Sequence, residues 1–350
     1  MPTQRKTMRT AAVCVAAAVV CVAARPTKAD FVLGAEQIVQ AGGANLVVTG
    51  YSVPSFIDWN NDGLKDLLIG EGGGGYAAKA RVYLNTGTSM QPAFSTYSFV
   101  QSNGGELTVP SSGCLGLFPR TVYWDADARK DLLIGMSDGR VKLYTNTGTD
   151  AAPTFDGGTF LQAGAPGAKI NIDVGDRATP SALDWNNDGK KDLVVGGLDG
   201  LVRYYLNEGT DAEPDFRLTR MAQINDANLV VPAGRSSPVV MDLNGDGMKD
   251  LLTGNTSGQL LLYANVGTDL DPTFGNYTQV TAAGVPIDLA GDARSRPFVC
   301  DWTGDGLPDV LIGAGDGKVH LYQGTPEPTA LALLGLGLVL ACSRRRRAIR

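Results

Sequence analysis

Five segments of the chain share one alternation of apolar and polar positions. Each segment starts with a proline in a short apolar stretch, passes through a loop rich in aspartate, and ends in a second apolar run such as Leu67–Gly70. The prolines lie 65, 61, 58 and 59 residues apart, and they are Pro54, Pro119, Pro180, Pro238 and Pro297. Short apolar runs between turn residues predict β-strands, and their regular spacing predicts an all-β repeat protein.

Two more strands follow in most units. A turn, often Asp-Gly, leads to an alternating strand with a tyrosine at one fixed place, and four units continue through a Gly-Thr turn to a Pro-x-Phe strand. About four strands per unit is the size of a propeller blade. One such sheet cannot bury both of its faces, so neighbouring sheets must stack. We therefore predict a five-bladed β-propeller that occupies residues 30–325.

The phase of the repeat predicts how the ring closes. The chain begins with a Phe strand at Phe31, the type that follows the Tyr strand elsewhere, and the last unit ends after Tyr322 without one. We expect the N-terminal strand to complete the last blade and so remove its free edge. A solenoid would instead need polar caps at both ends, and the sequence has none.

Composition and charge agree with this fold and narrow the class of partner. The chain contains 45 Gly and 18 Pro, typical of a turn-rich β protein. Ten of its 30 basic residues and one of its 36 acidic residues lie in the two ends, so residues 30–325 carry a formal charge of −15. Such an acidic body argues against a nucleic-acid partner and favours bound divalent cations.

The two ends are interpreted as targeting segments. Residues 1–29 place Arg5, Lys6 and Arg9 before an apolar run and end in Thr27-Lys28-Ala29, the pattern of a secretory signal peptide. The alternative is a buried helix or a membrane anchor.

Residues 326–350 contain Pro326-Glu327-Pro328, a short hydrophobic segment over 329–342, and the run Arg344–Arg347. This order resembles the PEP-CTERM sorting signal. The resemblance implies processing by an exosortase-type enzyme and delivery to the surface or matrix of a Gram-negative-type bacterium. Before processing, the protein would contact the membrane only through this tail. The alternative is a plain tail anchor.

The aspartate loops are the main candidate site. In four units, positions 1, 3, 5 and 9 of the loop carry acidic, amide or hydroxyl side chains, and position 6 is glycine. Calcium prefers six to eight oxygen ligands, and the backbone carbonyl of position 7 would add one. The predicted ligands are Asp58, Asn60, Asp62, Leu64 and Asp66; Asp184, Asn186, Asp188, Lys190 and Asp192; Asp242, Asn244, Asp246, Met248 and Asp250; and Asp301, Thr303, Asp305, Leu307 and Asp309. The alternative is that these aspartates only shape turns.

The second unit departs from the pattern. Tyr123 replaces the first aspartate and Ala128 replaces the glycine, so we expect that loop to bind calcium weakly or not at all. About four Ca²⁺ sites are therefore predicted. Together with the Leu-Leu-Ile-Gly runs, the loops resemble the FG-GAP/VCBS repeats of integrin-like propellers. The resemblance implies calcium as a structural ion and a role in adhesion, recognition or scaffolding. Family members commonly have seven blades, so five would be a departure.

A second candidate surface lies on the opposite face. Three residues before the unit proline stand Tyr51, Arg177, Arg235 and Arg294, which would bind a carboxylate or an acidic sugar. The alternative is that each arginine pairs with an acid such as Asp176 or Asp292. All four tryptophans share one repeat position, which Leu243 fills in the fourth unit. That replacement favours packing over sugar stacking.

The sequence favours a non-catalytic surface or matrix protein that binds a glycan or a protein. His320 is the only histidine, so a Ser-His-Asp triad and a His-based zinc site lack parts. The alternative function is a carbohydrate-active, glycosidase-like enzyme with carboxylates in the propeller channel.

Overall fold

The computed structural model describes residues 31–73, 75–113, 116–125, 127–289, 291 and 294–326. Every regular element in these residues is a β-strand, as expected for an all-β protein. They contain no helix that is long and apolar enough to cross a membrane. The predicted signal peptide at 1–29 and nearly all of the predicted sorting tail at 326–350 lie outside them.

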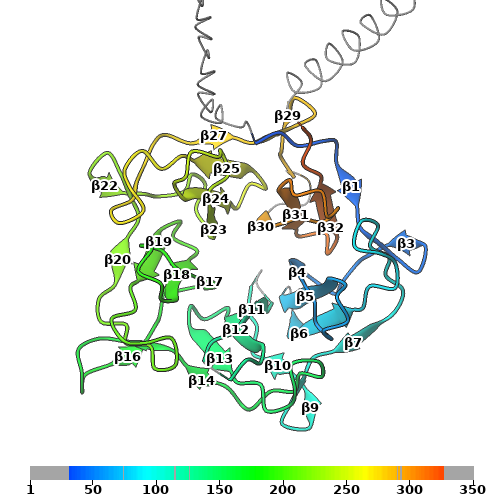
Figure 1. The fold of residues 1–350 in the computed structure, drawn as a ribbon, viewed down its shortest axis with the longest axis horizontal. Coiled ribbons are helices and arrows are strands. Elements are labelled where there is room, and N and C mark those ends of the chain that lie inside the picture. Colours follow the sequence, from blue (N-terminus) through cyan, green and yellow to red (C-terminus); the bar gives the residue numbers. More distant parts are fainter. Residues whose placement is uncertain are drawn as a thin grey trace, which may run out of the picture.

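Five larger sheets form from the five repeat units of the described chain, and Figure 1 shows them arranged around a common centre. From the centre outwards they contain β4 (Val53–Ile57), β5 (Asp66–Gly73), β6 (Tyr76–Tyr83) and β10 (Thr108–Val109), with β7 (Tyr97–Phe99) also on β6; β11 (Phe118–Val122), β12 (Asp131–Gly135), β13 (Val141–Tyr144) and β14 (Thr159–Phe160); β17 (Thr179–Leu183), β18 (Asp192–Gly196), β19 (Val202–Tyr205) and β20 (Arg220–Met221); β23 (Ser237–Met241), β24 (Asp250–Gly254), β25 (Leu260–Tyr263) and β27 (Thr278–Gln279); and β30 (Arg296–Cys300), β31 (Asp309–Gly313), β32 (Val319–Tyr322) and β1 (Gln37–Ile38).

The architecture is propeller-like because the first strand of each sheet faces the centre. Each of these inner strands, β4, β11, β17, β23 and β30, contacts the inner strand of the next sheet, and β30 contacts β4. Within a sheet the neighbouring strands are antiparallel. The loop between the first two strands therefore lies on one face of the ring, and the turn between the second and third lies on the other.

Short hairpins at the periphery fasten each sheet to the next. They are β2 (Gln40–Ala41) with β3 (Ala44–Asn45), β8 (Gln101–Ser102) with β9 (Gly105–Glu106), β15 (Gln162–Ala163) with β16 (Ile170–Asn171), β21 (Gln223–Ile224) with β22 (Ala227–Asn228), and β28 (Thr281–Ala282) with β29 (Val285–Pro286). Each hairpin makes a parallel contact with the neighbouring unit. These contacts are Ala41 with Phe94, Ser102 with Phe155, Ala163 with Phe216, β21 with β26 (Thr273–Phe274), and Ala282 with Leu33.

The hydrophobic core is divided into layers between neighbouring sheets. One cluster joins Leu68 of the first sheet to Ile134 of the second, and three others join the second to the third, the third to the fourth and the fourth to the fifth. A further cluster joins Leu311 of the fifth sheet to Leu67 of the first. Burial of these branched side chains on both faces of each sheet is the main stabilising contribution of the repeat.

The tryptophans lie in these layers and are at most 9% exposed, which confirms the packing interpretation. Each one meets the Phe ring of the neighbouring unit, as in Trp59 with Phe155 and Trp302 with Phe94. Leu243 fills the same place in the layer between the fourth and fifth sheets.

The N-terminal strand is held by the last sheet. Strand β1 pairs with β32, where Ile38 lies opposite His320. The ring of His320 is buried and contacts the carboxylates of Glu36, just before β1, and of Asp316. Burial opposes the charged imidazole, but its hydrogen bonds with Asp316 and Glu36 outweigh this effect and raise the pKa of His320 above its usual range.

We expect this contact to make the attachment of β1 depend on pH. A histidine whose pKa is raised by folding stabilises the native state below its unfolded pKa of about 6.5, and this contribution is lost as pH rises through the folded pKa. The stability advantage of the wild type over His320→Gln, measured by urea unfolding from acidic to alkaline pH, should therefore shrink as pH rises. A difference that is constant with pH would show that the ring contributes only packing.

Candidate functional site

Four of the five aspartate loops are folded around the carboxylate at position 1. In the first loop, the backbone N–H groups of Asp62 and Gly63 donate to the carboxylate of Asp58 at 3.2 and 2.9 Å. The third and fifth loops repeat both contacts with Asp184 and Asp301. The loop backbone thus converges on one acidic side chain.

Two loop positions need a left-handed backbone. Position 4 has a positive φ in Asn61 and Asn187, where the side chain tolerates this region, and in Gly245 and Gly304. Position 6 has φ of +88° at Gly63. Asn or Gly at position 4 and Gly at position 6 therefore indicate the backbone shape that brings positions 1, 3 and 5 close together.

The aspartate at position 9 has a role in the fold that the other loop aspartates lack. Asp66 is fully buried, and its two carboxylate oxygens accept the N–H groups of Trp59 and Asn85, both at 2.8 Å. The same pair of contacts recurs in the other units. The acceptors are Asp131, Asp192, Asp250 and Asp309. This carboxylate therefore ties the loop to the end of the third strand, which sequence reasoning did not foresee.

The negative charges of a loop act on one another. Burial raises the pKa of Asp66, the two backbone donors oppose the shift, and the charges of Asp62 and Asp58 add to it. The same causes raise the pKa of Asp192 and Asp250. Among the described residues, no three His, Cys, Asp or Glu side chains form a ready metal cage. The donor set nevertheless fits calcium chemically, because it is a cluster of mutually repelling carboxylates completed by amide and backbone oxygens.

The second loop pairs one of its aspartates with a cationic side chain of its own. Ala128 takes the left-handed backbone of the missing glycine, with φ of +59°. The guanidinium of Arg129, at position 7, donates to Asp127 through Nε at 2.7 Å and forms an ion pair with it. This contact lowers the pKa of Asp127. The one loop that lacks the first aspartate thus carries a cationic side chain of its own.

Contacts between sheets on the loop face were also missed by sequence reasoning. The amide of Asn61 donates to Asp150 of the second unit at 2.6 Å, and Lys130 donates to the Asn61 oxygen at 2.8 Å. The amide of Asn187 contacts Asp269 in the same way at 2.7 Å. The signal in the sequence is a Lys at position 8 together with an Asp after the Gly-Thr turn.

The residues predicted for the opposite face lie at the start of the inner strands. The guanidinium of Arg294 donates to the phenol oxygen of Tyr51 at 3.0 Å and lies 5.0 Å from the ring centroid. The guanidinium of Arg177 lies directly over Gly113. A Cβ atom added to this glycine would be only 2.4 Å from Nη2 of Arg177. Arg235 is 2% exposed. No ion pair joins Arg177 or Arg294 to an acid in the described chain, although Asp292 lies outside it.

The centre of the ring is filled by Arg120 of β11. Its guanidinium donates to the backbone oxygens of Pro54 and Pro297, at 3.1 and 3.2 Å, and to the hydroxyl of Ser55 at 2.9 Å. Three inner strands are therefore joined by one side chain. Burial lowers the pKa of Arg120 to about 9, so the group is still charged at neutral pH.

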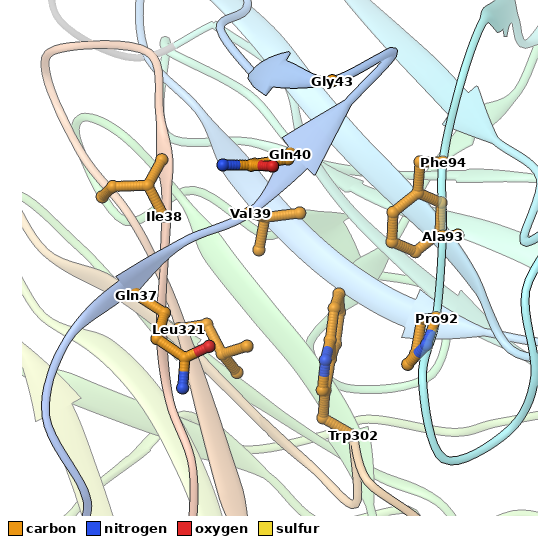
Figure 2. Close-up of a pocket in the computed structure, with 10 residues that line it drawn as sticks. All are labelled: Gln37, Ile38, Val39, Gln40, Gly43, Pro92, Ala93, Phe94, Trp302 and Leu321. Atoms are coloured by element: carbon orange, nitrogen blue, oxygen red, sulfur yellow. The ribbon is translucent and has the colours of Figure 1, made fainter.

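A cavity of about 620 Å³ lies between the N-terminal strand and the first unit. Figure 2 shows it bordered by Gln37 and Gln40 on one side and by Phe94 on the other, with Trp302 at its base. Phe56 stacks on Trp302 with ring centroids 4.5 Å apart, and the tryptophan is 6% exposed. The indole therefore offers no open face to a sugar ring.

Comparisons with known proteins identify two parts of the chain. Residues 184–253 and 242–312 match the model of the FG-GAP-like repeat, and residues 325–347 match the PEP-CTERM protein-sorting motif. The chain contains FG-GAP-like repeats and a PEP-CTERM sorting motif. Both repeat matches begin at the first aspartate of a loop and end in the second strand of the next sheet. The sorting motif indicates export to the cell surface or extracellular space, and implies an exosortase-type processing enzyme.

Integrin alpha-4 of Xenopus laevis is 26% identical over 189 residues, which cover 50% of this chain and 17% of that protein. Among solved structures, a Photorhabdus luminescens Tc holotoxin pore matches 85% of this chain and 15% of its own, with 13% identity and a TM-score of 0.41. BBS1N, solved in complex with ARL6DN, matches 85% of this chain and 98% of its own, with 12% identity and a TM-score of 0.37.

The two kinds of aspartate in the FG-GAP-like repeats should respond differently to substitution. In calcium-free buffer, Asp192→Ala should lower the free energy of unfolding by about 2–4 kcal/mol, because two buried N–H groups lose their acceptor. Asp188→Ala, in the same exposed loop, should cost less than about 1 kcal/mol. Chemical denaturation in chelator measures both values. Equal costs would contradict the structural role of position 9.

Proposed function

We propose that this chain is an exported, non-catalytic binding module, built as a five-bladed β-propeller whose N-terminal strand completes the last blade. The support for ring closure is the contact of β30 with β4, the pairing of β1 with β32, and the hydrophobic layer between the fifth and first sheets. A closed ring leaves no long sheet edge exposed, which suits a protein that works outside the cell.

We further propose that four of the five loops bind calcium as a structural ion. The observation that carries this proposal is the contrast between the loops. Four of them have an aspartate at position 1 whose carboxylate accepts loop N–H groups, whereas the second has Tyr123 there and pairs Asp127 with Arg129; the four are Asp58, Asp184, Asp242 and Asp301. In the first loop, Asp58, Asn60, Asp62 and Asp66, with the Leu64 carbonyl, would hold the ion. Bound calcium would neutralise the mutual repulsion and fix the loop.

A binding role is favoured over catalysis by the chemistry of the ring centre. None of the inner strands β4, β11, β17, β23 and β30 carries Asp or Glu. Glycoside hydrolysis requires two carboxylates facing one bond, and Arg120 occupies the space in which a channel substrate would lie. We therefore assign the protein to recognition or scaffolding at the cell surface or in the extracellular matrix, with a glycan or a surface protein as its partner.

Calcium should stabilise the folded chain by binding the native state alone. At a hundredfold excess over Kd, each site contributes about 2.7 kcal/mol, which corresponds to a rise in Tm of about 5 °C for a domain of this size. Thermal melting of the full chain in calcium and in chelator measures the rise, and elemental analysis should count about four ions per chain.

The variants Asp62→Ala and Asp246→Ala should each reduce this calcium-dependent rise and remove one ion. Asp127→Ala in the second loop is the matched control, and it should leave both the rise and the ion count unchanged. If all three variants respond to calcium like the wild type, the loops are ordinary turns and the calcium proposal is wrong.

A further inference from the structure

The residues that precede the inner strands form a defined surface, which we call the channel mouth. It consists of Tyr51, Arg177, Arg235 and Arg294, together with Ser112 and Tyr76 from adjoining loops. All the inner strands start at the same end of the ring, because they contact one another around the centre and lead to loops on the other face. The turn between β5 and β6, which follows Gly72 and Gly73 and is called the Gly-rich turn below, adjoins the mouth, since the N–H of Tyr51 donates to the backbone oxygen of Gly72 at 3.0 Å.

The backbone of the channel mouth is strained in a regular way. Arg177, Arg235 and Arg294 occupy equivalent places in three successive units and have φ of +57°, +59° and +79°. This region is uncommon for residues other than glycine, and such residues tend to be kept at ligand-binding sites. A glycine would adopt the same backbone without strain, so the recurrence of arginine points to a use for its side chain.

The arginines of the mouth differ from five other arginines of the described chain. Arg81, Arg129, Arg140, Arg203 and Arg217 each form an ion pair with an acid. Arg177 and Arg294 form none within the described residues, and the buried Nε of Arg177 has no hydrogen-bond partner. Arg294 and Arg296 both lie on the ring of Tyr51, at 5.0 and 5.2 Å from its centroid. A cationic cluster of this kind in an acidic body is suited to receive an anion.

We propose that the channel mouth binds the carboxylate of an acidic polysaccharide. This inference rests on the binding role proposed above and names its ligand class. The planar guanidinium groups match a carboxylate in geometry. Two neighbouring features match the rest of an acidic sugar: the exposed Ser112 supplies a hydroxyl, and the ring of Tyr76, which is 55% exposed, supplies an aromatic face.

Other polyanions fit the surface less well. The loop of Ser112 is joined to the turn of Tyr76 by a hydrogen bond from the Ser111 hydroxyl to the backbone oxygen of Tyr76 at 2.5 Å. The guanidinium of Arg177 lies over Gly113 of the same loop, so a hydroxyl and an aromatic residue adjoin this arginine. An acidic peptide would use only the arginines. A nucleic acid would bring a dense row of phosphates against a body of charge −15. A sugar polymer carries its carboxylates further apart and can insert one at a time.

The test is a binding titration of the full chain with hyaluronate, with uncharged dextran and poly-glutamate as comparisons. Arg177→Gln and Arg294→Gln should each weaken hyaluronate binding about tenfold, because each removes a charge-assisted hydrogen bond. The double variant should be weaker than either. Arg217→Gln, an exposed arginine of the third unit away from the mouth, is the matched control and should bind like the wild type. Binding should weaken from about 50 to about 300 mM salt.

Several outcomes would overturn the proposal. They are absence of hyaluronate binding, equal binding by the double variant, and preference for dextran. Preference for poly-glutamate, lost in the double variant, would assign the mouth to an acidic protein instead. Melting of every variant with and without calcium keeps the two proposals apart. If calcium stabilises the wild type but hyaluronate does not bind, only the channel-mouth proposal is wrong. If calcium does not stabilise the wild type, the proposal of a calcium-stabilised module is wrong.

Discussion

The buried aspartate that ends each loop is the contact on which the rest of the repeat depends. Asp66 accepts one N–H from the loop and one from Asn85 at the end of the third strand. The side-chain oxygen of Asn85 then accepts the N–H groups of Gly87 and Ala93, which shapes the turn that leads to Phe94. Because Phe94 packs against Trp302 and receives the hairpin of the last unit, a single carboxylate positions the contacts on which stacking of neighbouring sheets depends.

This dependence has an electrostatic consequence. Each loop holds further acids close to its buried carboxylate, so negative charge collects on the loop face. Burial is the main cause that raises the pKa of Asp66 and Asp192, and repulsion from the other acids of the loop adds to it. A counter-charge would relieve this repulsion. The second loop shows one solution within the chain itself, since Arg129 pairs with Asp127. In the other four loops, no lysine or arginine of the described chain forms an ion pair with a loop aspartate. Lys190, which holds the position of Arg129 in the third loop, donates to the backbone oxygen of Asn207 instead. This is the physical argument for an external cation.

Repetition made much of the fold predictable, and departures from repetition explain what was missed. The proline, aspartate and tyrosine each recur at the same position of the repeat unit. Their positions therefore indicate the order of the strands and the all-β class. The strands of the peripheral hairpins, such as β8 and β9, are only two residues long, so they show no apolar pattern in the sequence. The hydrogen bond from Asn61 to Asp150 joins side chains that lie 89 residues apart in the sequence, so no local sequence pattern reveals it. Arg120 could have been found, because it is a charged residue at an inward position of an otherwise uncharged inner strand.

Selectivity in a ring of similar units must come from the places where the units differ. The differences gather around the first and second units: the Gly-rich turn ending in Tyr76, the loop of Ser112, and Arg120 in the centre. The guanidinium of Arg120 donates only to neutral oxygens, those of Pro54, Ser55, Pro119 and Pro297. No carboxylate of the described chain pairs with it, so its charge adds to the positive potential at the mouth. The acidic loops on the opposite face and this buried cation together give the ring a polarity along its axis, and an anionic ligand would approach from the arginine side.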